Sequence, residues 1–299
     1  MLERDKLHLG ENLEVCRAHL PDASIDACYI DPPFNTGRDF SEYYDKFTEE
    51  RPLSVEDKAR FEQKWSWLEG ITSTSQYNYY KFMIPRLEEI HRVLKPTGSF
   101  FLHVDHRECA HSRIVLDKIF GASQTANHLL WAYPAATMAW GKSRSFRNAA
   151  DHILFYRKSD AGFFQEVYLP LTKKELIKKF PYTNSQGKRY RNTGIQNQRE
   201  YAENATCNPA TSVWQLPIAP QRERTGYPTQ KPIALLQRII ECSTEAGQVV
   251  LDIFCGSGTT CVAAQQLNRH YIGIDMNPEA IEVAQQRLKR RTIEWTQSS

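Results

Sequence analysis

Two short segments of the chain carry the side chains best suited to chemistry. The first, "DPPF" at Asp31–Phe34, follows an apolar run at 25–30 that is typical of a buried strand. Proline has no backbone N–H, and it pushes the residue before it toward extended geometry. The segment is therefore predicted to stop strand pairing and to display an acid and an aromatic ring at the end of the strand.

The second segment is a glycine turn, "CGSGTT" at 255–260, which lies between an apolar run and a helical stretch. Such a turn lets a ligand approach backbone N–H groups at the start of the helix. Asp275 ends the next short strand, and a carboxylate can accept hydrogen bonds from both hydroxyls of a ribose. The pattern predicts a nucleoside cofactor, although a turn with no ligand is the alternative. The dinucleotide fingerprint expects glycine or alanine where Cys261 stands, which weakens a nicotinamide interpretation.

Both segments belong to an alternation of strands and helices. Strands are predicted at 25–30, 99–104, 128–133, 152–158, 248–254 and 271–275, and helices at 80–94, 107–120, after Pro232, after the glycine turn and after Asn277-Pro278. This order indicates an α/β fold with a doubly wound, mostly parallel sheet. Ligands of such sheets sit beyond the carboxyl ends of the strands, so we expect Asp31 and Gly256 to meet at one edge. Residues 37–76 are predicted to be one long irregular segment.

The composition narrows the class of protein. Of 299 residues, 41% are hydrophobic and 24% are charged, which is typical of a globular protein. No apolar stretch reaches about 20 residues and the charged N-terminus lacks a signal-peptide core, so neither a membrane span nor export is expected. The seven cysteines are scattered singly without a CxxC pair. This argues against a disulfide framework and against a zinc site, and it favours a reducing cytoplasm.

The positive charge of the chain is concentrated in one window. Residues 171–231 hold 11 Lys and Arg against four Glu, a net charge of +7, whereas the rest of the chain carries −4. Such asymmetry indicates a polyanion as partner, and a solvated, loop-rich insertion is the alternative. The chain therefore divides into a catalytic half at 1–158, a basic insertion at 159–226 and a cofactor-binding half at 227–299.

Together, "DPPF" and "DIFCGSGTT" resemble the DNA amino-methyltransferases, which methylate adenine N6 or cytosine N4. Their order, with a variable region between them, resembles the beta class of that family. "YPTQKP" at 227–232 and "LHLGENLEV" at 7–15 are similar to two further motifs of the class. The resemblance covers most of the chain outside 159–224. It implies a Rossmann-like methyltransferase fold, S-adenosylmethionine as cofactor and double-stranded DNA as substrate.

The resemblance also implies roles for individual residues. The Asp31 carboxylate and the Pro32 carbonyl would accept the two N–H bonds of the target amine, Pro33 would help to hold that carbonyl outward, and Phe34 would stack on a flipped base. The cofactor would be held by a larger set, namely Glu11, Thr229, Lys231, Pro232, Asp252, Phe254, Gly256, Gly258, Thr259, Thr260, Asp275 and Met276. No metal takes part.

The basic insertion is then expected to recognise the DNA target. Lys188, Arg189, Arg191 and Arg199 are predicted DNA contacts, through phosphates or base edges. Asp31 at the first motif position favours adenine N6 over cytosine N4. A nicotinamide-dependent oxidoreductase and a non-catalytic DNA-binding module remain as alternatives of other classes. The resemblance further implies a homodimer, a cognate restriction endonuclease, and a place in the cytoplasm near the nucleoid of a prokaryote or in a phage-infected cell.

Overall fold

The computed structural model describes residues 2–39, 44–45, 47, 53–133, 146, 148–195, 198–204 and 207–296. They form two compact units, the first made of Met1–Gln165 and Ser212–Ser299 and the second of Glu166–Thr211. The second unit lies inside the stretch at 159–226 that charge and composition set apart, while 159–165 and 212–226 belong to the first unit.

An eight-stranded sheet forms the centre of the first unit, in the order β1-β15-β14-β2-β5-β7-β6-β13. Every strand runs parallel to its neighbours except β7, which is antiparallel to both β5 and β6. The strands are β1 (Lys6–Leu9), β2 (Ile25–Ile30), β5 (Leu94–Val104), β6 (Thr125–Ala132), β7 (Ala150–Arg157), β13 (Val213–Gln215), β14 (Val249–Asp252) and β15 (His270–Asp275). The predicted α/β class with a mostly parallel sheet is confirmed.

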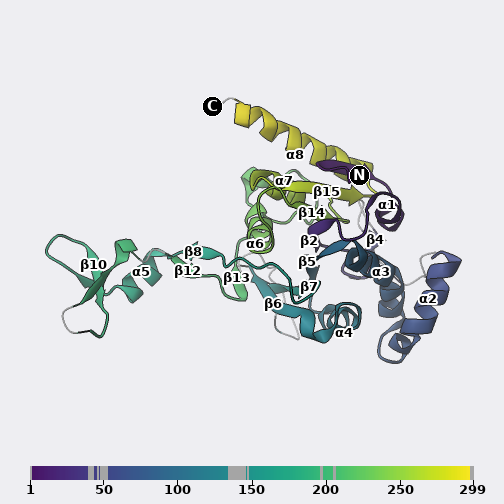
Figure 1. The fold of residues 1–299 in the computed structure, drawn as a ribbon, viewed down its shortest axis with the longest axis horizontal. Helices are drawn as coiled ribbons and strands as arrows, with labels where there is room; N and C mark the ends of the chain where they lie inside the picture. The colour runs from purple at the N-terminus through teal and green to yellow at the C-terminus, as the bar shows by residue number, and fades with distance from the viewer. Residues whose placement is uncertain are drawn as a thin grey trace. The chain divides into compact units, whose positions relative to one another are not determined.

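Helices cover both faces of this sheet (Figure 1). One set packs in series on one face and contains α1 (Asn12–His19), α3 (Thr74–Val93) and α4 (Cys109–Phe120). The other set contains α6 (Ile233–Ser243), α7 (Thr259–Gln266) and α8 (Pro278–Thr296). Because the central strands are covered on both sides they are mostly apolar, and all six residues of β2 are buried, Asp26 included.

The prediction of an irregular segment at 37–76 is wrong for its second half, while residues 40–43, 46 and 48–52 of its first half lie outside the described part of the chain. Its second half contains α2 (Val55–Trp65) and the 3-10 turn η1 (Ser66–Gly70), and α3 begins at Thr74. Ser54 caps α2 by accepting a hydrogen bond from the backbone of the third helical residue. Phe61 and Trp65 lie one helical turn apart and are both buried, but the polar residues around them obscure this spacing in the sequence.

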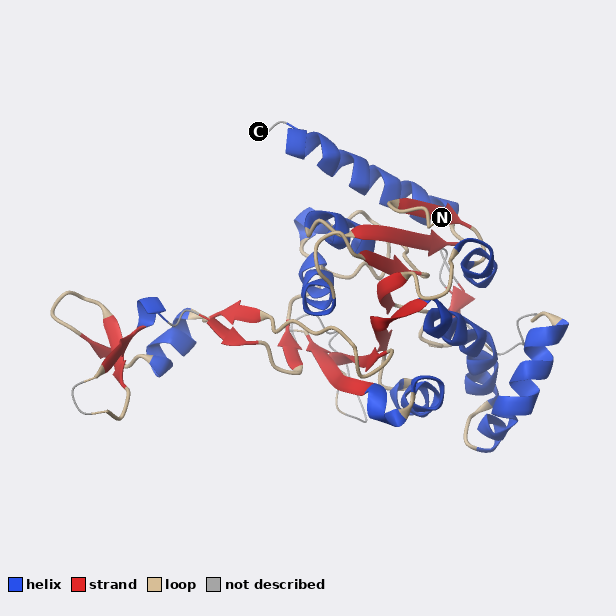
Figure 2. Ribbon diagram, viewed as in Figure 1, coloured by secondary structure: helices blue, strands red, loops and turns tan. Residues whose placement is uncertain are grey.

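The second unit consists of short elements (Figure 2). A three-stranded antiparallel sheet joins β9 (Tyr182–Thr183), β10 (Arg189–Asn192) and β11 (Arg199–Tyr201). A separate antiparallel pair joins β8 (Tyr168–Pro170) to β12 (Cys207–Pro209), α5 (Lys173–Lys179) follows β8, and the 3-10 turn η4 (Ala202–Asn204) follows β11.

The first unit also has short elements outside the central sheet. They are β3 (Arg38–Asp39) paired with β4 (Tyr44–Asp45), and the 3-10 turns η2 (Ala122–Gln124) and η5 (Gln221–Glu223).

The glycine turn brings α7 and α8 unusually close. Gly258 precedes α7 with φ +74°, and a Cβ built on it would lie 2.6 Å from the Cβ of Ala284 in α8. Only glycine satisfies both the left-handed backbone and this contact. Gly247 offers a comparison, since its φ is +80° but a Cβ there would meet no described atom within 4 Å.

We therefore expect Gly258→Ala to destabilise the protein more than Gly247→Ala does. The control carries only backbone strain of about 1–2 kcal/mol, whereas Gly258→Ala adds overpacking of about 1–3 kcal/mol. Urea unfolding of both variants measures the difference. Equal losses of stability would show that the contact with Ala284 does not constrain this turn.

Candidate active site

A cavity of about 670 Å³ lies at the carboxyl ends of three neighbouring strands, β15, β14 and β2. Its volume is in the range of small-molecule sites. It is lined by the DPPF segment, the glycine turn and the loop at 227–231. The predicted site residues that it gathers are Asp31, Pro32, Pro33, Phe34, Thr229, Lys231, Asp252, Phe254, Gly256, Thr259, Thr260, Asp275 and Met276.

Three predicted cofactor residues are not among those that line the cavity. Glu11 caps α1 and forms an ion pair with the buried Arg86. Its neighbour Asn12 lines the cavity instead, and the Asn12 side-chain amide donates to the Ile253 carbonyl at 2.9 Å. Pro232 and Gly258 have structural positions, immediately before α6 and α7 respectively.

The two oxygens of the Asp31 carboxylate have different environments. Oδ2 accepts from the Lys231 ammonium at 2.5 Å, and that ammonium also lies 5.2 Å from the centre of the Phe34 ring. Oδ1 is buried and has no hydrogen-bond partner within the described part of the chain. A buried acceptor without a donor costs about 1–3 kcal/mol, so this oxygen is poised to accept a hydrogen bond from a ligand.

Asp275 organises the glycine turn. Its two oxygens accept from the backbone N–H groups of Gly256 at 2.8 Å and Asn277 at 2.9 Å. Gly256 has φ +48°, and a Cβ on it would lie 3.2 Å from the Tyr227 ring, so the turn closes tightly on the loop at 227–231. Burial raises the pKa of Asp275 above its ordinary value.

Asp252, at the end of β14, is the most deeply placed acid of the cavity. It accepts from the Thr260 hydroxyl at 2.5 Å and from the Phe254 N–H at 3.0 Å. Burial raises its pKa to about 7 although these hydrogen bonds lower it, and the negative charges of Asp31 and Asp275 raise it further. The carboxyl group is therefore half protonated near neutral pH.

A buried hydrogen-bond chain behind Phe34 is not evident from the sequence. The Tyr29 hydroxyl contacts His103 Nδ1 at 2.8 Å, and His103 Nε2 contacts Asp151 at 3.2 Å. The His103 ring is fully buried and lies 5.7 Å from the Phe34 ring. The sequence favours an ordinary polar strand end for His103, because nothing local indicates that the reversed strand β7 brings Asp151 beside it.

Three of the predicted DNA-binding residues lie on the three-stranded sheet of the second unit, and Lys188 lies immediately before β10. Each of the four makes a contact inside that unit. These contacts are Lys188 with Glu203 (3.1 Å), Arg191 with Glu200 (2.6 Å), Arg189 with the Phe180 carbonyl (3.2 Å), and the Arg199 guanidinium with the Tyr190 ring (4.5 Å). Lys188, Arg191 and Arg199 are nevertheless exposed.

Among the described residues, no helix is both long and apolar enough to cross a membrane.

Known proteins resemble this chain along most of its length. The type II methyltransferase M.HpaI of Haemophilus parainfluenzae is 29% identical, over 90% of this chain and 70% of its own length. The Mod subunit of the type III restriction-modification enzyme StyLTI of Salmonella typhimurium is 27% identical over 87% of this chain, which spans only 49% of that relative.

Solved structures share the fold. PvuII DNA methyltransferase, described as cytosine-N4-specific, aligns with a TM-score of 0.61 at 16% identity, over 96% of this chain and 87% of its own. The M1.HpyAVI–SAM complex aligns with a TM-score of 0.55 at 18% identity, over 95% and 98% respectively. The family model for DNA methylases of the N6/N4 type matches residues 25–286, from β2 to α8. A match of this extent includes both halves of the cavity, and the chain belongs to the N6/N4 DNA methylase family.

Proposed function

We propose that this protein is a site-specific DNA methyltransferase that moves a methyl group from S-adenosylmethionine to the N6 amine of adenine. One observation carries the proposal. An acid with an unpartnered buried oxygen, Asp31, shares a cavity with a glycine turn and a strand-end acid, Asp275. An acceptor for an amine and a holder for a nucleoside are thus within one site.

The cavity residues fit S-adenosylmethionine, which supplies an electrophilic methyl group on a positively charged sulfur. A carboxylate has about four lone-pair positions, so Asp275 can accept two ribose hydroxyls in addition to its two backbone N–H groups. Phe254 and Met276 offer apolar surface for the adenine ring, and Thr229, Thr259 and Thr260 offer hydroxyls. The tight approach of Gly256 to Tyr227 leaves no space for a side chain beside the ligand.

Asp31 and Pro32 would activate the target amine. The lone pair of an exocyclic amine is delocalised into the base, which makes it a poor nucleophile. When Asp31 Oδ1 and the Pro32 carbonyl accept both N–H bonds, the nitrogen is drawn toward tetrahedral geometry and its lone pair becomes available. As the N–C bond forms, the bond between the methyl carbon and the sulfonium sulfur would break, and the cofactor would leave as a neutral thioether. The Asp31 carboxylate would stabilise the positive charge that develops on nitrogen until one N–H proton is lost to solvent.

Phe34 and Lys231 would fix the geometry of this step. A target base must leave the duplex to be reached, and stacking on Phe34 is worth about 1–3 kcal/mol toward that cost. Lys231 holds Asp31 Oδ2 and leaves Oδ1 toward the substrate. The position of Lys231 also lets its ammonium approach the methionine carboxylate of the cofactor.

The second unit would recognise DNA. Residues 166–211 hold eight Lys and Arg against four Glu, and their exposed cations are suited to phosphates.

The second candidate for the target is cytosine N4, because the family includes enzymes for both amines. The aspartate at position 31 favours adenine. The relative named as a subunit of a type III restriction-modification enzyme supports a cognate endonuclease as partner. A homodimer is the proposed assembly, and the prokaryotic nucleoid is the proposed place of action.

Nucleoside analysis tests both the activity and its target. We expect the protein, incubated with mixed-sequence DNA and labelled S-adenosylmethionine, to produce N6-methyladenine that mass spectrometry identifies. Asp31→Ala should abolish the transfer and leave cofactor binding nearly unchanged, while Asp160→Ala, an exposed acid outside the cavity, should remain active. If the product is N4-methylcytosine, the target base is cytosine and not adenine. Turnover by Asp31→Ala would contradict the proposed mechanism.

A pair of substitutions tests the DNA face. Lys188→Gln and Glu203→Gln remove the same ion pair but change the net charge in opposite directions. If Lys188 contacts a phosphate, only Lys188→Gln should weaken DNA binding and reduce the slope of log K against log salt, by about 0.9. Fluorescence anisotropy at several salt concentrations measures both. An equal effect of the two variants would show that the ion pair, and not the cation, matters.

The pKa of Asp252 predicts how stability depends on pH. The folded protein keeps the proton up to about pH 7, whereas the unfolded chain releases it near 3.8. Between these values the folded state binds more protons, so the free energy of unfolding falls as pH rises, by at most about 1.4 kcal/mol per pH unit. Asp252→Asn should flatten this dependence between pH 5 and 7 in urea unfolding, and Asp160→Asn should not. Parallel curves for all three proteins would exclude a raised pKa.

A further inference from the structure

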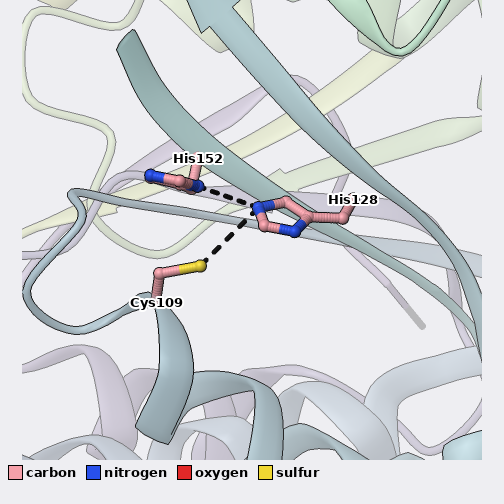
Figure 3. Close-up of side chains that lie close together, drawn as sticks. All are labelled: Cys109, His128 and His152. Atoms are coloured by element: carbon pink, nitrogen blue, oxygen red, sulfur yellow. Dashed lines mark hydrogen bonds between the residues drawn. The ribbon is translucent and has the colours of Figure 1, made fainter.

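Three potential metal ligands converge outside the cavity, from three different elements (Figure 3). Cys109 begins α4, His128 lies in β6 and His152 lies near the start of β7. Their ligand atoms all lie within 4.8 Å of one another. Cys109 Sγ is 3.6 Å from His128 Nε2, which is 2.8 Å from His152 Nδ1. The ligands are 19 and 24 residues apart in the chain, which explains why cysteine spacing alone predicts no metal site.

Hydrogen bonding does not satisfy this cluster. Both contacts fall on one nitrogen, His128 Nε2. A neutral ring nitrogen carries either one proton or one lone pair, so Nε2 can serve only one of its two neighbours at a time. A cation between the three atoms would accept a lone pair from each of them.

Two of the three separations are near those around a tetrahedral ion, and the third, between Cys109 Sγ and the His152 ring nitrogen, is at most 4.8 Å. With Zn–S about 2.3 Å and Zn–N about 2.0–2.1 Å, tetrahedral angles place S and N about 3.6 Å apart and two N atoms about 3.3 Å apart. The S···N separation is already 3.6 Å, and the N···N separation of 2.8 Å needs to open by about half an ångström. His128 is an exposed residue, so a rotation of its side chain can supply this change and solvent can deliver the ion.

We propose that Cys109, His128 and His152 form a zinc site, with these three as the ligands that the described part of the chain supplies. A thiolate with two imidazoles selects a borderline-soft ion such as Zn²⁺ over Mg²⁺ or Ca²⁺. Bound zinc would fasten the start of α4 to β6 and β7. Glu108, the residue before Cys109, accepts from Asn35 at 3.0 Å, and Asn35 immediately follows Phe34. The ion would thereby also steady the segment after DPPF.

Metal binding by the untagged, full-length chain tests this proposal. After treatment with EDTA and gel filtration, we expect the chain to bind one Zn²⁺, measured by mass spectrometry of the metal, and to show a thiolate-to-cobalt absorption band with Co²⁺. Zn²⁺ should raise the melting temperature. Cys109→Ser should remove the cobalt band, and His128→Asn and His152→Asn should each weaken Zn²⁺ binding about tenfold or more.

Cys207→Ser is the matched control, since it removes an exposed cysteine of the second unit. It should keep the cobalt band and the zinc-dependent rise in melting temperature. Circular dichroism of each variant without metal establishes that it is folded. Equal Zn²⁺ binding by Cys109→Ser and Cys207→Ser, or a wild-type chain without the cobalt band, would overturn the proposal.

Discussion

The parallel pairing of β2 with β14 is the contact on which the site depends. It joins Ala27 to Val250 and Cys28 to Leu251, across more than 220 residues of chain. The buried Asp26 reinforces it, because its Oδ2 accepts from the Val249 N–H at 2.9 Å. Since parallel strands end at the same edge, this pairing puts the DPPF segment beside the glycine turn. Asp31 and Gly256 then line one cavity, although no local sequence signal connects the two segments.

The pairing of these strands also determines which charged side chains line the cavity. Among the described residues that line it, four are acids, Asp31, Asp252, Asp275 and Glu279, and Lys231 is the single cation. Lys231 neutralises Asp31 directly, whereas Asp252 responds to burial and to its acidic neighbours by a raised pKa. A cavity with excess negative charge favours a cationic ligand, and a sulfonium cofactor is of that kind. The charge distribution and the proposed chemistry are therefore consistent.

The sequence predicts best what is encoded locally. Proline and glycine fix the backbone at DPPF and at the glycine turn, and apolar runs mark the central strands, so the fold class and most of the cavity residues could be predicted. The meeting of Asp31 with Gly256 also follows from a parallel sheet, but individual side-chain contacts between distant elements could not be predicted. Glu11 is drawn into an ion pair with Arg86, which leaves Asn12 to face the cavity. The pairing of His103 with Asp151 depends on the direction of β7, which no pattern in the chain indicates.

That reversed strand has a further consequence. Successive residues of a strand point to opposite faces of the sheet, so Asp151 and His152 serve two different groups. Asp151 completes the hydrogen-bond chain that reaches Phe34 through His103, and His152 faces Cys109 and His128 on the other side. An ion held by His152 would restrain the backbone of β7 next to Asp151. The proposed zinc site and the Phe34 ring are thus connected by one peptide bond of β7 and two side-chain contacts, a path short enough for the packing of one to constrain the other.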